Sequence, residues 1–267
     1  MQKNNGSIFY NIKLENGEAK LIIHPDNKLD FEKYTPEIPD IFNNSSNVVN
    51  KNSRNEIKKF KNEFNLNEPI IIKKFGQQGL YDNIRFRVSK SRAFRSFKAA
   101  CWLKRLEISI PQTFLAIEYR TTGNKLINSY YVCKYIDFDF DLYDVYKEKV
   151  YSDKIEELIC DLAIRAKKIH DNNIIYNDFH PNNVHFKRDE NDLYEMYFID
   201  FNRVKKSKSL NLKKKAKDLF RLRIPEGYLN LFLNKYEPNS ADKLAKYIKK
   251  YYQKHLKFKK LKNKLRS

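Results

Sequence analysis

The stretch IIYNDFHPNNVHF (174–186) places a carboxylate, an imidazole and an amide at a spacing that could support phosphoryl transfer. Asp178 is followed five positions later by Asn183, and Asp200 arrives shortly afterwards in YFIDFN (197–202). An Asp beside an acceptor hydroxyl can orient it and accept its proton, whereas an Asn and a second Asp supply oxygen ligands that suit Mg²⁺. Taken singly, each residue is just as typical of a polar turn.

A lysine upstream completes the groups that transfer of phosphate from ATP requires. Lys73 lies in the apolar stretch PIIIKKF (69–75), and a lysine on a rigid strand can hold the phosphates of a nucleotide. Its neighbour Lys74 is the alternative, and either one alone could be a solvated strand residue. The joint order of lysine, D-x-x-x-x-N and Asp favours the phosphotransferase interpretation over the structural one.

The N-terminal half is predicted to consist mostly of strands. Residues 8–23 predict a hairpin around Asn16-Gly17, and residues 24–53, which are rich in Pro, Asn and Ser, predict a connector. Further strands are expected at EIKKF (56–60), PIIIKKF (69–75) and SYYVCKYI (129–136), with one helix at 91–106.

The C-terminal half is predicted to be mostly helical. An apolar stripe in 151–173 indicates a long helix, and the catalytic stretch then leads into a hairpin that ends near Asp200. Lys-rich helical segments fill residues 205–267. We therefore expect an α+β, protein-kinase-like bilobal fold, with a β-rich lobe over 1–134 and a helical lobe over 135–267.

Composition points to a globular, strongly basic protein. Of the 267 residues, 41% are hydrophobic, and 53 Lys and Arg against 33 Asp and Glu give a net charge of +20, which attracts polyanions. Three cysteines without metal-ligand spacing favour reduced thiols. No apolar stretch predicts a signal peptide or a membrane span, so a cytoplasmic protein is expected.

Longer stretches resemble the lipopolysaccharide kinase family, the Kdo and heptose kinases of the inner core. The resemblance runs from about residue 48 to 222 and includes neither end of the chain. Its most specific parts are SKSRAFRSF and IDFNR. The matching stretches are SRNEIKKF, PIIIKKF, SKSRAFRSFKAACWL, SIPQTFLAIE, INSYYVCKYI, IIYNDFHPNNVHF, YFIDFNRV and LFRL.

The resemblance implies a role for each matching residue. It makes Asp178 the catalytic base, with His180 beside it as a contact of the γ-phosphate. It makes ATP and Mg²⁺ the cofactors, and a sugar linked to lipid A, with Kdo favoured over heptose, the acceptor. The implied nucleotide-binding residues are Lys73 or Lys74, Cys133, Tyr135 and Asp137; the implied Mg²⁺ ligands are Asn183 and Asp200; and the implied acceptor-binding residues are Arg85, Arg87, Arg92, Arg95 and Arg203.

The sequence departs from the general kinase pattern in four places. Tyr176 stands where kinase loops usually carry a histidine, and Asn202 stands where Gly usually follows Asp-Phe. No glycine lies between Gly17 and Gly76, so a glycine-rich phosphate loop is absent, and the helix 91–106 has no Glu to pair with Lys73. An inactive pseudokinase is therefore an alternative.

Three segments concentrate the positive charge. Eight basic residues and no acid lie between Arg85 and Arg105, seven Lys lie between Lys205 and Lys217, and residues 242–267 carry eleven Lys or Arg against one Asp. The last segment predicts an amphipathic helix that can lie on the anionic cytoplasmic face of the inner membrane. The competing interpretation is a solvated helix that packs on its own lobe. Its predicted apolar face comprises Leu244, Tyr247, Ile248, Tyr251, His255 and Phe258.

Two other function classes compete with a sugar-lipid kinase. Kinases of the aminoglycoside or choline type share the D-x-x-x-x-N…D order, but the basic stretch 85–105 argues against the acidic acceptor pocket usual among them. The charge and the 37 Phe and Tyr could also indicate nucleic-acid binding. No binding signature accompanies them and core packing accounts for most of the aromatics, so no nucleic-acid partner is expected.

Overall fold

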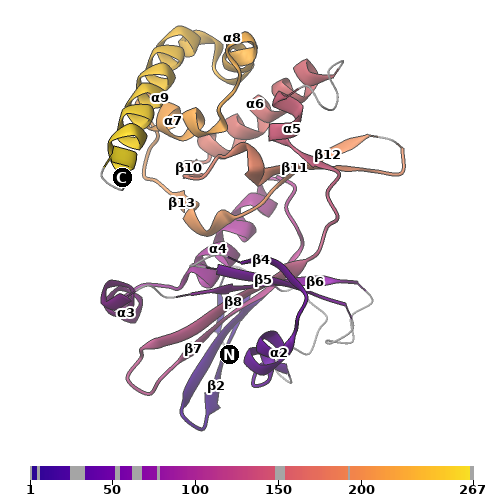
Figure 1. Cartoon of the computed structure of the whole chain (residues 1–267), viewed down its shortest axis with the longest axis vertical. Coiled ribbons are helices and arrows are strands. Elements are labelled where there is room, and N and C mark those ends of the chain that lie inside the picture. Colours follow the sequence, from indigo (N-terminus) through magenta and orange to yellow (C-terminus); the bar gives the residue numbers. More distant parts are fainter. Residues whose placement is uncertain are drawn as a thin grey trace. The chain divides into compact units, whose positions relative to one another are not determined.

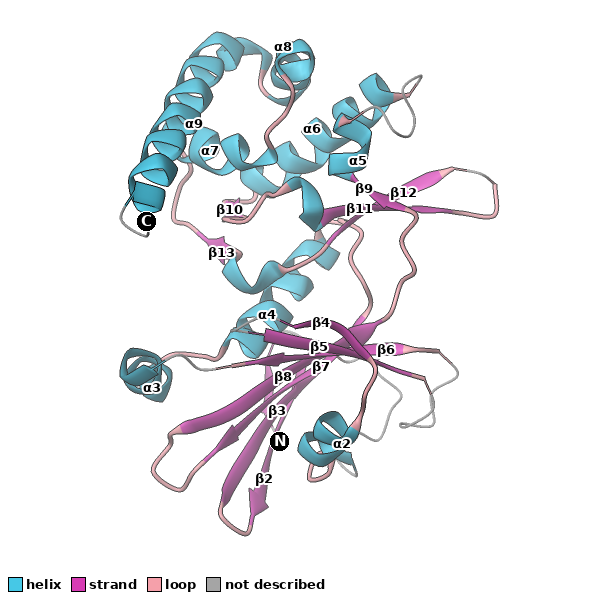
Figure 2. Cartoon of the chain, in the orientation of Figure 1, coloured by secondary structure: helices cyan, strands magenta, loops and turns pink. Residues whose placement is uncertain are grey.

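The computed structural model of the chain describes residues 2–4, 7–24, 34–51, 55–61, 68–76, 79–147, 154–191 and 193–264. The chain divides into two compact units. Unit 1 comprises Met1–Trp102 and Pro111–Asp137, and unit 2 comprises Leu103–Ile110 and Phe138–Ser267. The boundary expected between residues 134 and 135 lies close to the last of these breaks. Unit 1 is mostly strand and unit 2 mostly helix, as Figure 2 shows.

Unit 1 is built on one antiparallel sheet of eight strands in the order β1-β2-β3-β7-β8-β6-β5-β4 (Figure 1). Among the described residues of this unit, the helices α2, α3 and α4 accompany the sheet, and the last residues of α4 belong to unit 2. The elements are β1 Gln2–Asn4, β2 Ser7–Leu14, β3 Gly17–Ile23, α2 Ile38–Asn44, β4 Val48–Lys51, β5 Asn55–Phe60, β6 Ile70–Phe75, α3 Gly79–Val88, α4 Arg92–Arg105, β7 Thr113–Arg120 and β8 Leu126–Lys134.

The predicted strands of unit 1 are confirmed, but the interpretation of 24–53 as a connector is wrong. The hairpin of β2 and β3, the strands β5, β6 and β8 and the helix α4 all form where expected. Within 24–53, however, the described residues form α2 and β4. The surrounding Pro and Asn residues favoured a loop over a helix in the sequence. Ile38 and Phe42 are nevertheless four residues apart, and they bury one face of α2 against the sheet.

One apolar cluster holds α2 on this sheet. Phe42 contacts the rings of Phe60 and Tyr130, with centroid distances of 6.2 and 5.5 Å. Lys58 is also buried there, and its ammonium donates to the carbonyls of Phe42 and Ser45. The charge is therefore satisfied by the end of α2, which a buried ammonium requires.

Unit 2 contains the predicted long helix, the predicted hairpin of β11 and β12, and a helical C-terminal part. Its strands form a sheet in the order β12-β11-β9 and a pair of β10 with β13. The elements are β9 Phe140–Asp141, α5 Leu142–Tyr146, α6 Ile155–Asp171, β10 Ile174–Ile175, η1 Pro181–Asn183, β11 Val184–Arg188, β12 Tyr194–Phe198, η2 Phe201–Arg203, β13 Lys205–Lys206, α7 Leu212–Leu219, η3 Phe220–Leu222, α8 Glu226–Tyr236, η4 Pro238–Ser240 and α9 Ala241–Lys264.

The C-terminal helix α9 is only partly packed on unit 2. Leu244 is buried and Tyr251 half-buried, and the ring of Phe220 lies 6.1 Å from that of Tyr251. From residue 252 onwards every described side chain is exposed, including Phe258 at 65% and Leu261 at 57%. None of the described helices is both long enough and apolar enough to span a membrane.

Replacing Gly17 at the start of β3 by any residue with a Cβ atom is predicted to destabilise the protein. A Cβ atom there would lie 2.0 Å from the carbonyl oxygen of Arg120, which is backbone and cannot move aside. We expect Gly17→Ala to lower the free energy of unfolding by about 2 kcal/mol, measured by urea denaturation. Gly227→Ala is the control, since no atom lies within 4 Å of its Cβ position. Equal stability of the two variants would contradict the prediction.

Candidate active site

The loop that carries Asp178 is fixed by one buried carboxylate, that of Asp218 at the end of α7. Its Oδ2 accepts from the backbone N–H of Tyr176 at 2.7 Å, and its Oδ1 accepts from that of Asn177 at 2.7 Å. An Asp in the last turn of a helix is disfavoured by the helix dipole, and burial of its charge adds a further cost. These contacts offset that cost and position the residues immediately before Asp178.

A histidine and a tyrosine complete this buried network. His170 of α6 lies with its Nε2 3.1 Å from Asp218 Oδ2, and its Nδ1 2.6 Å from the hydroxyl of Tyr236 in α8. Both ring nitrogens are therefore engaged, so the orientation of the imidazole is set by two other helices. The catalytic loop is thereby tied to α6, α7 and α8 together.

Tyr176, which replaces the usual kinase histidine, ties the loop to the strand before Asp200. Its hydroxyl donates to the carbonyl of Ile199 at 2.6 Å. Its ring stacks on that of Phe179 with a centroid distance of 4.5 Å, and both rings are fully buried. Tyr176, where kinases usually have a histidine, is therefore a buried residue that still holds the loop through a hydrogen bond.

Hydrogen bonds link Asn183 both to Asp178 and to the residue before Asp200. The backbone N–H of Ile199 donates to the carbonyl of Asn183 at 3.0 Å, because β11 and β12 pair as a hairpin. The side-chain Nδ2 of Asn183 donates to the carbonyl of Asp178 at 2.9 Å, which holds the amide against the loop. These two hydrogen bonds lie within unit 2 and connect the segments that contain Asp178, Asn183 and Asp200.

Two residues of this site adopt a left-handed backbone conformation. Asp200 has φ 60° and ψ 62°, and Asn177 has φ 62°. Asp and Asn are the residues other than glycine that tolerate this region best, which explains their use at these two bends. The side chain of Asn202 donates to a carboxylate oxygen of Asp200, so Asn202, the residue that departs from the kinase pattern, orients the acid.

The donor set of Asn183 and Asp200 fits a magnesium ion. Mg²⁺ is held in such sites by one or two protein oxygens, with waters and substrate phosphates completing the shell. An amide fixed through its nitrogen and an adjacent carboxylate match this requirement. Among the residues the structure describes, no group of three His, Cys, Asp or Glu is placed to hold a metal.

His180 lies beside Asp178 and is neutral at pH 7. Its backbone N–H donates to the carbonyl of Asp178 at 2.6 Å, and its Nδ1 accepts from the N–H of Asn182 at 3.3 Å. Partial burial lowers the pKa of His180 below its ordinary value; the charge of Arg223 lowers it further, whereas Asp178 opposes the shift. A neutral ring with Nδ1 as acceptor presents its other nitrogen as a donor.

Two arginines approach the carboxylate of Asp178. The Nη1 of Arg203 lies 3.4 Å from Asp178 Oδ1, and the Nη1 of Arg221 lies 4.0 Å from the same oxygen. The expected role of Arg203 in binding an acceptor stays a prediction, and the structure places its guanidinium next to Asp178. Arg221 and Asp218 were missed by the sequence analysis. Both lie in the segment KKKAKDLFRL, whose lysines dominate the pattern, and no local signal marks either residue.

The two candidate lysines of unit 1 lie on opposite faces of β6. Lys74 faces α2, where its ammonium donates to Asn43 Oδ1 at 3.1 Å. Lys73, one position away on the strand, points to the other face, because successive strand residues alternate. It pairs in register with Tyr131 and lies near Cys133, whose pKa burial raises to about 12 while the charge of Lys73 opposes the rise.

The segment expected to contact adenine forms internal contacts. Cys133 is buried in β8. The ring of Tyr135 stacks under the ammonium of Lys59 at 3.4 Å, and its hydroxyl donates to Asp137 Oδ1 at 3.0 Å. The backbone of Tyr135 also pairs with Pro69, so this stretch is held against the start of β6.

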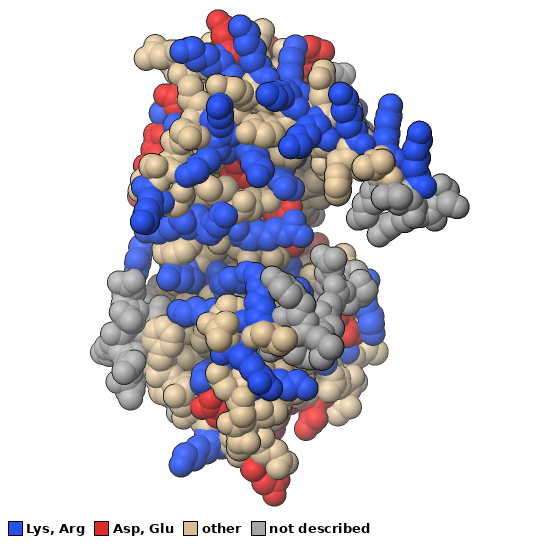
Figure 3. Space-filling view, turned by 90° about the vertical axis from the view of Figure 1, so that its left-hand side faces the viewer, with Lys and Arg blue, Asp and Glu red and all other residues tan. Residues whose placement is uncertain are grey.

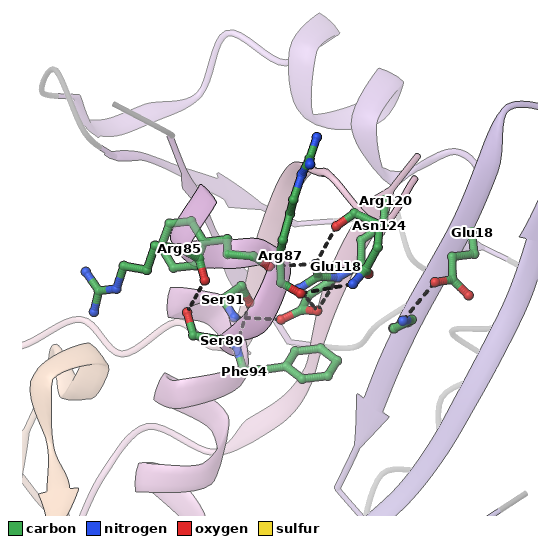
Figure 4. Close-up of polar contacts among 11 residues, drawn as sticks. Glu18, Arg85, Arg87, Ser89, Ser91, Phe94, Glu118, Arg120 and Asn124 are labelled. Atoms are coloured by element: carbon green, nitrogen blue, oxygen red, sulfur yellow. Dashed lines mark hydrogen bonds and ion pairs between the residues drawn. The ribbon is translucent and has the colours of Figure 1, made fainter. Parts of the chain in front are cut away.

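The arginines in α3 and α4 differ in the burial and the direction of their side chains. Arg92 donates to the carbonyl of Gly76 at 3.1 Å, and Arg95 is half-buried in α4. Figure 4 shows the side chains of Arg85 and Arg87 pointing away from the polar cluster behind them.

That cluster centres on a buried ion pair in β7. Glu118 and Arg120 are 3% and 5% exposed and contact each other at 2.7 Å (Figure 4). Glu118 also accepts from the N–H of Ser91 at 2.7 Å, and Arg120 donates to the carbonyl of Phe86 at 2.8 Å. The pair thus joins the end of α3 to the start of α4, and it was not anticipated from the sequence.

A pocket of about 500 Å³ opens within unit 2 between η3, α8 and α9. Phe220, Leu229 and Tyr252 supply apolar walls, and Arg223 and Lys249 supply positive charge.

Asp218→Asn is predicted to loosen the catalytic loop. An amide can accept only through its oxygen, so one buried backbone N–H loses its acceptor. We expect the free energy of unfolding to fall by about 1–3 kcal/mol, and amide exchange at Tyr176 and Asn177 to accelerate. The control is Asp161→Asn, which breaks a partly exposed pair with Arg165 and is expected to cost under about 0.5 kcal/mol. Unchanged exchange at both amides would contradict this account of the loop.

Comparisons with known proteins bear on the family and the fold of this chain. A family model, "Lipopolysaccharide kinase (Kdo/WaaP) family", matches residues 46–230, which is more than half of the chain. The chain is similar in fold to a solved structure, "WaaP in complex with acyl carrier protein", with a TM-score of 0.62 and 12% identity over 88% of this chain and 98% of that one. A Rio2 kinase from Chaetomium thermophilum, solved as an ADP/Mg²⁺-phosphoaspartate complex, matches with a TM-score of 0.49 and 10% identity over 93% of this chain and 81% of that one. No curated protein matched the sequence. The extent of the family match shows that the chain belongs to the lipopolysaccharide kinase (Kdo/WaaP) family.

Proposed function

We propose that this protein transfers the γ-phosphoryl group of ATP to a sugar hydroxyl of the lipopolysaccharide inner core. Kdo on lipid A is the favoured acceptor and heptose the next. The observation that supports the proposal most is the loop that Asp218 holds through Tyr176 and Asn177, in which the side chain of Asn183 contacts the backbone of Asp178. Family membership supports the reaction class, and the choice of acceptor is the finer part of the proposal.

Each group has a role in this reaction. Asp178 orients the acceptor hydroxyl for in-line attack and takes its proton, and neutral His180 donates to the phosphoryl group being transferred. Lys73, rather than Lys74, holds the nucleotide phosphates, because Lys74 lies on the face of β6 that α2 covers, near Asn43 and Phe42. Cys133, Tyr135 and Asp137 are proposed to contact the adenine.

The metal site is part of the same proposal. Asn183 and Asp200 would hold Mg²⁺, which neutralises charge on the phosphates. The hydrogen bond from Asn183 to the carbonyl of Asp178 fixes the amide beside the base, whether or not an ion is bound.

The acceptor is proposed to be polyanionic. Arg85 and Arg87 extend from α3, and with Arg92, Arg95 and Arg203 they offer positive charge to such a molecule. The related WaaP structure contains an acyl carrier protein, so a protein partner is a further proposal for this chain. Lys and Arg are spread over the face of unit 2 that carries α7, α9 and β13, which Figure 3 shows, and this charge would suit an anionic partner.

The exposed end of α9 is proposed to bind the cytoplasmic face of the inner membrane. Residues 244–251 pack on unit 2, as the competing interpretation of this helix expected. Beyond them, Leu256, Phe258 and Leu261 are exposed among lysines. Apolar side chains on a basic helix insert at the lipid interface, with each basic residue near the surface contributing about 1 kcal/mol.

Mass spectrometry of the acceptor tests the proposed reaction. Kdo-bearing lipid A incubated with the protein, ATP and Mg²⁺ is expected to gain about 80 Da, one phosphoryl group. Asp178→Asn removes the proton acceptor and is expected to slow the gain by roughly 100- to 10,000-fold, whereas Asp161→Asn is the control that keeps wild-type rates. No gain with either Kdo-bearing or heptose-bearing lipid A would overturn the proposal.

Sedimentation with vesicles tests the membrane contact. Replacing Phe258 and Leu261 by Ser removes exposed apolar area without changing charge, so binding to vesicles of anionic phospholipid is expected to weaken about tenfold or more. Replacing exposed Ile164 of α6 by Ser is the matched control and is expected to leave binding unchanged. If the α9 variant sediments as well as wild type, α9 does not mediate the contact.

A further inference from the structure

Two guanidinium groups from different elements converge on one oxygen of the catalytic base. Arg203 lies in η2, directly after Asp200, and Arg221 lies in η3, after α7. Their Nη1 atoms are 3.4 and 4.0 Å from Asp178 Oδ1. Both arginines are partly exposed, at 51% and 39%, and Asp178 is 23% exposed. Their ends are thus accessible to a ligand that reaches the carboxylate.

Stability does not account for this arrangement. Ion pairs exposed to this degree contribute about 0–1 kcal/mol, and placing two positive charges on one carboxylate adds repulsion between them. The loop is already held through the backbone by Asp218 and through the carbonyl of Asp178 by Asn183. The arginines therefore add little to the folding of the loop.

The guanidinium geometry fits a further anion beside Asp178. Each guanidinium has five N–H donors in a planar fork. In both arginines the atom nearest to Asp178 is Nη1. The remaining donors match the oxygens of a carboxylate or a phosphate in paired hydrogen bonds.

The position of the arginines favours the acceptor over the nucleotide as the source of that anion. They approach the carboxylate end of Asp178, which is the end that must face the acceptor hydroxyl. The proposed metal ligand Asn183, in contrast, contacts the backbone carbonyl of Asp178. Basic residues also continue outward from Arg203 along β13, where Lys205 and Lys206 are exposed. The anionic ligand is therefore expected to lie on the acceptor side.

We propose that Arg203 and Arg221 form a subsite for an anionic group, a carboxylate or a phosphate, that the acceptor carries next to the hydroxyl facing Asp178. This inference rests on the proposed function only in taking Asp178 as the residue that faces the acceptor. The site would then recognise two features of the acceptor, namely the hydroxyl and the anionic group next to it. Acceptors without such a group bind without help from the two arginines.

The test measures acceptor binding at equilibrium without ATP, so that it does not depend on turnover. The probe is Kdo-bearing lipid A in detergent micelles, used in three forms: intact, with its carboxylates converted to methyl esters, and with its phosphates removed. The variants are Arg203→Ala and Arg221→Ala. Arg221→Lys keeps the charge without the fork. Lys235→Ala is the matched control, because it removes one exposed positive charge from α8 of the same unit.

We expect each alanine variant to bind intact probe about tenfold or more weakly than wild type, with Arg221→Lys in between and Lys235→Ala unchanged. If the anion is a carboxylate, the variants and wild type bind the esterified probe equally; if it is a phosphate, they bind the dephosphorylated probe equally. Either pattern supports the subsite and identifies its ligand.

Three results would overturn the subsite. One is equal binding of intact probe by wild type and both alanine variants. Another is absence of probe binding by wild type. The third is a loss of affinity confined to a non-hydrolysable ATP analogue, which would assign the arginines to the nucleotide. Failure of the phosphorylation assay alone leaves these binding results standing, so the two proposals fail separately.

Discussion

The buried carboxylate of Asp218 is the contact on which the arrangement of the active-site loop depends. It accepts two backbone N–H groups directly before Asp178 and also contacts His170, which in turn contacts Tyr236. A charge 2% exposed can be kept only if it is well paired, so the chain before Asp178 has to stay where these donors meet the carboxylate. The position of Asp178, the proposed base, is thereby coupled to the packing of three helices.

A few further hydrogen bonds and one strand pairing position the other residues of the site. Tyr176 joins the loop to Ile199, and pairing of β11 with β12 brings Asn183 to the end of the strand that leads into Asp200. The side-chain amide of Asn183 then returns to the carbonyl of Asp178. Hydrogen bonds therefore link Asp178 to Asn183, and Asn183 to the residue directly before Asp200.

Much of this site could be predicted from the sequence, because its residues are close together in the chain. Asp178, Asn183 and Asp200 are separated by a turn and one hairpin, and strand patterns identify such hairpins well. Asp218 could not be predicted, since its partners lie 42 and 41 positions away and its own helix resembles a solvated lysine-rich segment. Helix α2 was missed for a related reason: its two buried residues become significant only against the sheet.

Positive charge has different consequences in different parts of the chain. Lys58, Arg120 and Lys215 are largely buried and satisfied by carbonyls or acids, so they serve the fold. Arg203 and Arg221 remain partly exposed around the base, and the lysines at the end of α9 surround exposed apolar side chains. The net charge of +20 therefore combines structural cations with those available to an anionic acceptor or surface.

We propose that Asp178, Asn183 and Asp200 act together, with the metal held by the last two. This proposal is tested most directly by the anomalous scattering of Mn²⁺ in crystals grown with a non-hydrolysable ATP analogue. We predict an ion about 2 Å from Asn183 Oδ1 and from a carboxylate oxygen of Asp200, with Asp178 outside the coordination shell. An ion bound by other residues, or nucleotide bound away from these side chains, would contradict the account.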